Sequence, residues 1–218
     1  MIKLIQGTTF WNINKFIVFI IKVIKGEWDE IYRKYGLEEI PWHTSKPEKD
    51  IVNLVKKKII KPGSVLDVGS GAGTNSLYLA SKGFKVTGVD VSPTAVAIAN
   101  KRRLRRGLNC NYVVGNILNV RFNQKFNIIF DRGCFHHIAK KDKPRYIGRL
   151  EELLKKGGKL YLHCFSDKSI FFYKNISKRD IKKYFKDFNI IYLKESIYTE
   201  PSTGWKRHMY SVFMEKIN

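Results

Sequence analysis

Residues 65–92 read VLDVGSGAGTNSLYLASKGFKVTGVDVS, and this stretch decides the fold. An apolar run ends at a glycine-rich turn, a short helical pattern follows, and a second apolar run ends at Asp90. The glycines Gly69, Gly71 and Gly73 allow the backbone to turn sharply and to approach a ligand closely. A strand, turn, helix and strand in this order form half of a nucleotide-binding unit. In such a unit the acidic residue at the end of the second strand, here Asp90, reaches the ribose of the nucleotide.

Two features of the turn indicate which nucleotide it binds. The glycines follow the pattern G-x-G-x-G, with Thr74 at the place where the dinucleotide pattern G-x-G-x-x-G has its third glycine. Asp67, two residues before the first glycine, would repel a pyrophosphate but attract an ammonium group. Adenosine joined to an amino acid satisfies both conditions, and a dinucleotide-binding unit is the alternative.

Apolar runs and helical patterns alternate along the rest of the chain. The sequence predicts strands at 64–68, 85–89, 112–114, 127–130, 159–165, 189–193 and 209–215, and helices at 75–81, 93–105 and 143–154, with another helix beginning at Ser177. This alternation predicts an α/β domain with a parallel sheet covered on both faces. We expect a helical extension over residues 1–27 and one domain over residues 28–218.

The glycine turn and Asp90 resemble motif I and the following acidic motif of the class I S-adenosylmethionine-dependent methyltransferases. Three further elements, W-x-x-x-Y from Trp28, P-W at residues 41–42 and D-R-G-x-x-H-H from Asp131, are similar to those of the thiopurine and thiol methyltransferases, which act on small molecules. The chain departs from many of these relatives at His43, where they have aspartate. The resemblance implies a three-layer, Rossmann-like, seven-stranded and mostly parallel sheet whose last strand is antiparallel.

The resemblance also implies a cofactor, S-adenosyl-L-methionine, and the residues that hold it. Glycine-turn residues would surround its methionine and sugar, Asp67 would bind its ammonium group and Asp90 its ribose hydroxyls. Asn116 would face the adenine, with a turn-forming role as the alternative, and Trp42 would be a lid residue unless it belongs to the core. The full predicted cofactor set is Trp42, Asp67, Gly69, Ser70, Gly71, Gly73, Asp90, Val91, Asn116, Ile117 and Asp131.

Methyl transfer from a sulfonium needs alignment of the reactants, exclusion of water and sometimes a proton acceptor, but no metal. We expect no metal ligands. Asp131, His136 and His137 follow the fourth strand and are the candidate catalytic residues, with the histidines as general bases near neutral pH. Structural histidines that cap the next helix are the alternative. The segment has no N-P-P-Y or D-P-P-Y sequence, which disfavours methylation of nucleobase amines.

Charge and apolar patterning leave alternative partners open. The formal net charge is +22, and its densest stretch is KRRLRR at residues 101–106, which would attract nucleic acid or form the solvated end of a helix. The apolar run at residues 16–21 is too short to span a bilayer. Residues 10–25 therefore form a helix that packs on the domain or contacts a membrane surface. The three cysteines form no C-x-x-C pair, which indicates reduced thiols and a cytoplasmic location.

We therefore expect a methyltransferase that acts on a small molecule, with a thiol as the candidate acceptor. The alternatives are an RNA or protein methyltransferase that docks through its basic surface, with nucleic acid not favoured, and a non-catalytic membrane-surface module.

Overall fold

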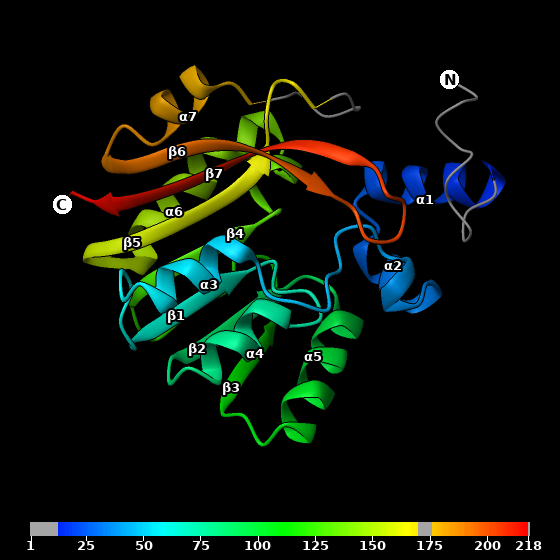
Figure 1. Ribbon diagram of the computed structural model, residues 1–218, viewed down its shortest axis with the longest axis horizontal. Coiled ribbons are helices and arrows are strands. Elements are labelled where there is room, and N and C mark those ends of the chain that lie inside the picture. Colours follow the sequence, from blue (N-terminus) through cyan, green and yellow to red (C-terminus); the bar gives the residue numbers. More distant parts are fainter. Residues whose placement is uncertain (1–12, 170–175, 218) are drawn as a thin grey trace.

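The computed structural model describes residues 13–169 and 176–217 of the chain. Its centre is a seven-stranded sheet with the strand order β3-β2-β1-β4-β5-β7-β6 (Figure 1). The strands are β1 (Ser64–Val68), β2 (Lys85–Asp90), β3 (Cys110–Val114), β4 (Phe126–Arg132), β5 (Leu154–Phe165), β6 (Phe188–Thr199) and β7 (Lys206–Lys216). β7 pairs antiparallel with both β5 and β6, and the pairs among β1 to β5 are parallel. The predicted Rossmann-like sheet with an antiparallel last strand is confirmed.

Helices cover both faces of the sheet because alternate residues of each strand point to opposite sides. One face packs against α3 (Lys49–Lys56) and α4 (Thr74–Ala80), and the other against α6 (Lys143–Leu153) and α7 (Lys178–Tyr184). α5 (Pro93–Arg105) follows β2 and contacts the β2 and β3 edge. Short 3₁₀ helices lie at Leu37–Glu39, Phe135–His137 and Lys140–Asp142.

Local sequence signals set several helix starts. Ser92 caps α5 by accepting a hydrogen bond from the Ala95 N–H at 3.0 Å, and Pro93 occupies the first turn. Ser177 and Asp180 form a reciprocal capping box at the start of α7. The helix predicted at 93–105 and the helix start predicted at Ser177 are therefore confirmed.

The C-terminal strands are longer than the sequence pattern predicts. β5 begins at Leu154, where the pattern still predicts helix, and β6 continues to Thr199 instead of ending at residue 193. β6 is an edge strand with many exposed side chains, so its apolar alternation is weak, yet its backbone pairs with β7 as far as Thr199↔Lys206. Hydrogen bonding to a neighbouring strand extends these elements beyond the apolar runs.

The N-terminal segment forms α1 (Ile13–Lys25) and α2 (Trp28–Lys34), which stand beside the carboxyl ends of the parallel strands (Figure 1). Residues 10–12 of the predicted helix lie outside the described residues. Phe19 and Val23 of α1 are buried with α2 and with Ala95 of α5. The packed alternative for this helix is thus observed, although Ile17, Val18, Ile21 and Ile24 on its other side are exposed. None of the helices in the described part is long and apolar enough to cross a membrane.

Candidate active site

A cavity of about 510 Å³ lies at the carboxyl ends of the parallel strands. Open α/β sheets bind ligands at this edge, where the strand order reverses on either side of β1. The cavity extends from the glycine turn after β1 to α1, the loop around Trp42 and the turn between β6 and β7. Segments from both ends of the chain therefore wall a site whose floor comes from the sheet.

The glycine turn forms one side of this cavity. Gly69 and Ser70 both donate backbone hydrogen bonds to the Val89 carbonyl, which ties the turn to the neighbouring strand. Gly71 has a φ of 52°, and a Cβ atom there would lie 2.6 Å from the hydroxyl oxygen of Tyr32. Only glycine gives both this backbone conformation and this close approach. Gly69, Ser70 and Gly71 line the cavity, as the predicted cofactor contact requires.

Gly73 has a different position from the other two glycines. It does not line the cavity but precedes α4, with a φ of 78°. A Cβ atom at Gly73 would lie 2.4 Å from the hydroxyl oxygen of Tyr112 and 3.1 Å from Ala99 Cβ. We therefore correct its predicted role, because this glycine is required for packing between the helix start, β3 and α5.

Two buried carboxylates line the cavity next to the turn. Asp67 accepts a hydrogen bond from Ser76 Oγ at 2.5 Å, and burial raises the pKa of Asp67 to about 6. Asp90 accepts hydrogen bonds from the Gly71 N–H at 2.8 Å and the Ser92 N–H at 2.9 Å. Burial also raises the pKa of Asp90. Asp90 thus fixes the glycine turn to the start of α5 while its carboxylate remains at the cavity wall.

The predicted adenine end lies where β2 and β3 terminate. Val91, Asn116 and Ile117 all line the cavity there. Asn116 Oδ1 accepts a hydrogen bond from the Leu118 N–H at 3.0 Å, so this side chain forms the turn after β3. The turn-forming alternative for Asn116 is observed. Its amide group is exposed at the cavity edge, so contact with a ligand remains compatible with that role.

Trp42 joins the N-terminal segment to the cavity. Its indole N–H donates to the Tyr32 hydroxyl at 3.1 Å, and its ring contacts Phe19 and Trp28. Trp42 is half-buried and lines the cavity, so it belongs both to the aromatic cluster of α1 and α2 and to the site. The core role considered for Trp42 is observed, and its lid role over the cofactor stays a prediction.

Asp131 does not reach the cavity. Its side chain is fully buried and accepts hydrogen bonds from the backbone N–H groups of Cys134 and Phe135 and from the Tyr146 hydroxyl at 2.7 Å. Burial raises its pKa to about 6. The predictions that Asp131 contacts the cofactor and acts as a catalytic group are therefore corrected, because its carboxylate turns inward to hold the loop after β4.

His136 and His137 both line the cavity and contact each other. Their Nε2 atoms are 3.1 Å apart, and the Phe165 N–H donates to His136 Nδ1 at 3.2 Å. The His136 ring stacks on Phe165, and the His137 ring meets Trp28 edge to face. Burial lowers the pKa of His136 and lowers that of His137 to about 3. Both rings are therefore neutral at physiological pH.

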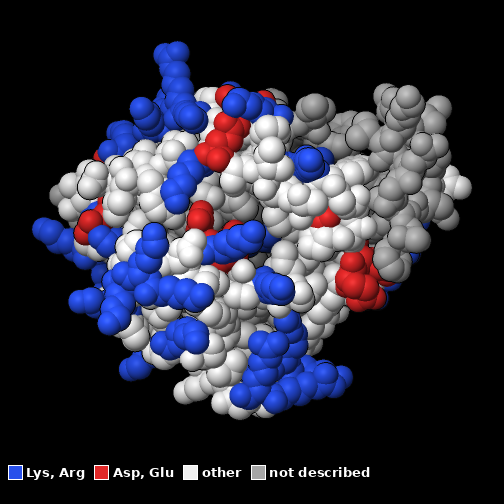
Figure 2. Space-filling model, viewed as in Figure 1, with Lys and Arg blue, Asp and Glu red and all other residues white. Residues whose placement is uncertain are grey.

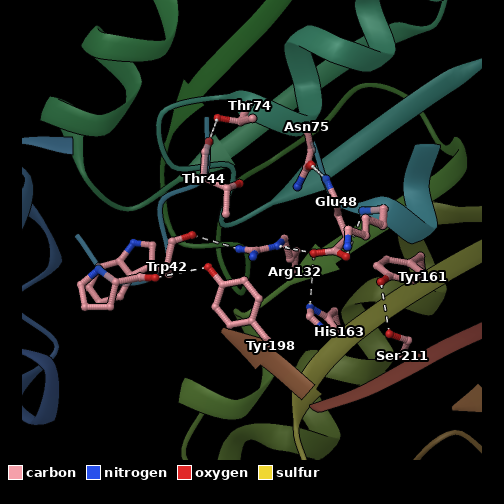
Figure 3. Close-up of polar contacts among 12 residues, drawn as sticks. Trp42, Thr44, Glu48, Thr74, Asn75, Arg132, Tyr161, His163, Tyr198 and Ser211 are labelled. Atoms are coloured by element: carbon pink, nitrogen blue, oxygen red, sulfur yellow. Dashed lines mark hydrogen bonds and ion pairs between the residues drawn. The ribbon is translucent and has the colours of Figure 1, made fainter. Parts of the chain in front are cut away.

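A largely buried ion pair that sequence reasoning missed lies beside the cavity behind Trp42, with its side chains 13% and 16% exposed (Figure 3). Arg132 Nε lies 3.0 Å from Glu48 Oε2, and Arg132 Nη1 donates to the Trp42 carbonyl at 3.0 Å. The guanidinium lies 5.0 Å from the centre of the Tyr198 ring, whose hydroxyl donates to the Pro41 carbonyl. The D-R-G pattern pointed to Arg132, but nothing in the sequence marked Glu48 or Tyr198, which are far from it along the chain.

Two more histidines share this end of the cavity. His163 Nδ1 lies 3.9 Å from Glu48 Oε2, and burial lowers the pKa of His163 to about 4 despite this carboxylate. Burial also lowers the pKa of His43 to about 4. Although burial opposes its ionisation, the charge of Arg132 and its hydrogen bond lower the pKa of Glu48. The carboxylate and the guanidinium are therefore the charged pair, and the histidines beside them are neutral.

The turn between β6 and β7 forms the wall opposite the glycine turn. Arg207 Nε donates to Glu200 Oε1 at 2.6 Å, and Thr203 Oγ1 donates to Glu200 Oε2 at 2.6 Å. Trp205 meets Phe16 of α1 edge to face at 4.8 Å between ring centres. All five residues line the cavity. This turn thus contacts α1 beside the cavity. It lines the cavity with the Trp205 ring and with the Glu200–Arg207 ion pair, whose charges balance.

These features are those of a nucleotide-binding α/β enzyme of the Rossmann-like methyltransferase class. Comparison with known proteins agrees, because residues 65–158 match the family model described as a methyltransferase domain. The chain is 31% identical over 105 residues to an uncharacterised methyltransferase of Schizosaccharomyces pombe, covering 48% of this chain and 72% of that protein. The chain belongs to the S-adenosylmethionine-dependent methyltransferases.

Other relatives match a smaller part of their own length. The 2-heptyl-1-hydroxyquinolin-4(1H)-one methyltransferase of Mycobacteroides abscessus is 35% identical over 98 residues, which is 44% of this chain and 43% of that protein. The probable thiol methyltransferase 2 of Arabidopsis thaliana is 31% identical over 127 residues, or 57% of this chain and 56% of that protein. The matched part of each of these two proteins is thus close to half of its length.

Solved structures share the fold. A structure described as conversion of a disulfide bond into a thioacetal group during echinomycin biosynthesis has a TM-score of 0.76 at 24% identity, covering 88% of this chain and 92% of that one. A Burkholderia thailandensis 1,6-didemethyltoxoflavin-N1-methyltransferase with bound S-adenosylhomocysteine has a TM-score of 0.68 at 19% identity, covering 91% of this chain and 89% of that one.

The residues of this chain fit the family's cofactor. Two carboxylates, Asp67 and Asp90, line the cavity on either side of a turn that approaches the ligand space through glycine backbone. One carboxylate suits an ammonium group and the other a ribose. S-adenosylmethionine supplies an activated methyl group on sulfur when it is bound. Within residues 13–169 and 176–217, no three His, Cys, Asp or Glu side chains gather where they could hold a metal ion.

Proposed function

We propose that this chain transfers the methyl group of S-adenosylmethionine to a small-molecule acceptor, with a thiol as the candidate. The observation that carries the proposal is a cavity of about 510 Å³ that is lined by the predicted cofactor residues at one end and by an aromatic wall at the other. This volume is typical of small-ligand sites, about 300–1,000 Å³. The aromatic wall comprises Phe16, Phe19, Trp28, Phe165 and Trp205.

In the proposed arrangement, Asp67 binds the ammonium group, Asp90 the ribose hydroxyls, and Val91, Asn116 and Ile117 border the adenine. Gly69, Ser70 and Gly71 bring backbone close to the methionine portion. Trp42 covers the cofactor while its indole is held by Tyr32. Asp131 is a positioning residue that orders the loop carrying the two histidines.

Isothermal titration with S-adenosylmethionine tests the cofactor role. We expect saturable binding by the intact chain and at least tenfold weaker binding by Asp90→Asn, about 1.4 kcal/mol, because the amide donates where the carboxylate only accepts. Asp187→Asn, a change at an exposed carboxylate, is the matched control and should bind normally. Thermal unfolding of both variants verifies that they are folded. Absence of binding by the unaltered protein would refute the proposal.

The distribution of charge supports a small acceptor over RNA. Figure 2 shows Lys and Arg gathered over the sheet end that carries the C-terminus and over α5. Lysines precede β1, β2 and β4, and Lys155 and Lys156 lie at the start of β5, all at the ends of the strands opposite the cavity. The C-terminal end of α5 lies on that same side. Arg102 also donates to the Ala72 carbonyl, so part of the stretch 101–106 is structural. Steep salt dependence of RNA binding that is coupled to methylation would instead favour the RNA alternative.

Two further expectations stay proposals. A cytoplasmic location is supported by Cys110, Cys134 and Cys164, which are all free thiols. A peripheral membrane contact through residues 10–25 is supported by the exposed apolar side of α1, but Lys15 and Lys22 there pair with Glu39 and Glu27. Flotation of the intact chain with anionic vesicles tests the membrane contact, and failure to float would remove it.

A further inference from the structure

Backbone N–H groups hold the carboxylate of Asp90 from both sides. Its Oδ1 accepts a hydrogen bond from the Ser92 N–H at 2.9 Å, and its Oδ2 accepts one from the Gly71 N–H at 2.8 Å. A carboxylate has about four acceptor positions, so this anchoring leaves capacity for the two hydroxyls of a ribose. The direction in which Asp90 presents that capacity therefore depends on where Ser92 and Gly71 are held.

Asp29 of α2 holds the Ser92 side of this arrangement. Asp29 Oδ1 accepts from Ser92 Oγ at 2.7 Å and from the Thr94 N–H at 2.9 Å, across 63 and 65 residues of chain. Ser92 is fully buried, and its hydroxyl oxygen also accepts the Ala95 N–H at 3.0 Å. The Ser92 side chain thus donates to Asp29 while its backbone donates to Asp90, which places this serine between the two carboxylates.

Tyr32 of the same helix stands against the Gly71 side. Asp29 and Tyr32 lie on one face of α2, because side chains three residues apart on a helix are neighbours. The Tyr32 hydroxyl oxygen lies 2.6 Å from the position that a Cβ atom of Gly71 would take, so the ring abuts the glycine turn. α2 also packs against α5 (Figure 1). One face of α2 therefore supports both residues that hold Asp90.

Loss of the Asp29 carboxylate would loosen the turn that carries Asp90. The Ser92 hydroxyl would become a buried donor without its acceptor, and the Thr94 N–H at the start of α5 would lose its charged partner. An unpaired buried donor is costly, so Ser92 would shift toward another acceptor. Because the Ser92 N–H holds Asp90 Oδ1, this shift also turns the Asp90 carboxylate. Hydrogen bonds from a ribose to Asp90 depend on that orientation.

We propose that Asp29 is a positioning residue that aims the Asp90 carboxylate at the ribose hydroxyls of the cofactor, so that α2 contributes to ribose recognition. The inference rests on the proposed function, in which Asp90 binds those hydroxyls. Of the residues that the structure describes, Asp90 lines the cavity and Asp29 does not. Asp29 therefore acts through Ser92, and its removal should weaken only ligands that carry the ribose hydroxyls. A residue that merely stabilised the start of α5 would not discriminate between such ligands.

Calorimetric titration of the intact protein with two ligands tests this role. The ligands are S-adenosylhomocysteine and its analogue without the 2′- and 3′-hydroxyls. We expect Asp29→Ala to bind S-adenosylhomocysteine at least about tenfold more weakly, because a hydrogen bond to a charged group has this size. The same variant should bind the analogue within about twofold of the unaltered protein, as changes that do not interact are additive. Asp29→Asn should restore most of the affinity, because its amide oxygen still accepts from Ser92 and Thr94.

Two further variants complete the test. Glu30→Ala is the matched control, because Glu30 is the next carboxylate of α2 and its side chain is 47% exposed in a pair with Arg33. It should bind both ligands as the unaltered protein does. Ser92→Ala breaks the same link from the other side, and it should show the same selective loss even if Asp29→Ala does not fold. Thermal unfolding verifies that each titrated variant is folded.

Equal weakening of both ligands by Asp29→Ala would overturn the inference, because Asp29 would then support only the fold. Unchanged binding of S-adenosylhomocysteine by Asp29→Ala and Ser92→Ala would also overturn it. Two other outcomes concern the proposed function instead. Failure of the unaltered chain to bind S-adenosylhomocysteine would refute the cofactor site, and equal affinity of the unaltered chain for the two ligands would refute the ribose role of Asp90. The failures are therefore distinguishable.

Discussion

Replacing Gly71 with alanine tests whether the glycine turn is built around the N-terminal segment. The new Cβ would lie 2.6 Å from the Tyr32 hydroxyl oxygen, which also accepts the Trp42 indole N–H. Gly107 is the matched control, because its φ of 60° resembles the 52° of Gly71 but nothing lies within 4 Å of its Cβ position. Both variants thus bear similar backbone strain, and only one of them bears a steric clash.

The expected losses in the free energy of unfolding follow from this difference. Left-handed backbone costs a non-glycine residue about 1–2 kcal/mol. Alanine also restricts the unfolded chain, which stabilises the folded state by about 0.4–1 kcal/mol, so Gly107→Ala should lower the free energy of unfolding by about 1 kcal/mol. Gly71→Ala must in addition displace Tyr32, and overpacking of this kind costs about 1–3 kcal/mol, including the strained Trp42 hydrogen bond. We expect a total loss near 3 kcal/mol.

Urea unfolding followed by tryptophan fluorescence measures both losses, and calorimetry measures S-adenosylmethionine binding by the folded variants. Gly71→Ala should also bind the cofactor more weakly, because the Gly71 N–H that holds Asp90 moves with the turn. Gly107→Ala should bind normally. Losses of stability within about 0.5 kcal/mol of each other would show that the contact between the turn and Tyr32 is not close, and would refute the reasoning.

Three other predictions concern the buried polar groups and a helix cap. Glu48→Gln should lower the free energy of unfolding by about 3 kcal/mol, because it leaves the largely buried Arg132 without its charge partner. Glu30→Gln, in the exposed pair with Arg33, should cost under about 0.5 kcal/mol, and equal effects of the two changes would contradict the argument. Ser177→Ala should cost about 1 kcal/mol through loss of the α7 cap, and an unchanged urea midpoint would count against it. His43, His137 and His163 in the cavity have pKa values lowered to about 3 to 4, so below about pH 6.5 the unfolded chain binds more protons than the folded chain. The free energy of unfolding should therefore fall as pH drops toward 4. The expected fall exceeds the roughly 1.4 kcal/mol that corresponds to one pKa unit. The pKa values of Asp67 and Asp131 are raised to about 6, so these two groups stabilise the folded protein as pH falls, but their pKa shifts are smaller. Urea midpoints that rise as the pH is lowered from about 6.5 to about 4 would contradict this prediction.

The local sequence was a good guide where a short segment determines its own structure. The strand at Ser64–Val68, the helix at Pro93–Arg105 and the capping box at Ser177 follow from apolar periodicity and side-chain caps within a few residues. The long β6 strand was underestimated, because its pairing with β7 depends on backbone hydrogen bonds that no periodicity in its own side chains reveals. α2 and α3 were not predicted for a related reason, since both are short and are stabilised by packing.

The sequence by itself determined the methyl-donor end of this protein, because a turn built from glycines and two aspartates is a local pattern tied to one backbone geometry. Only the tertiary structure decided the acceptor end. Asp131 turns inward, His136 bonds to Phe165 across 29 residues, and Arg132 meets Glu48 across 84 residues. Orientation and protonation depend on these distant partners and on burial, which exist only once the sheet has assembled and brought the carboxyl ends of its strands together.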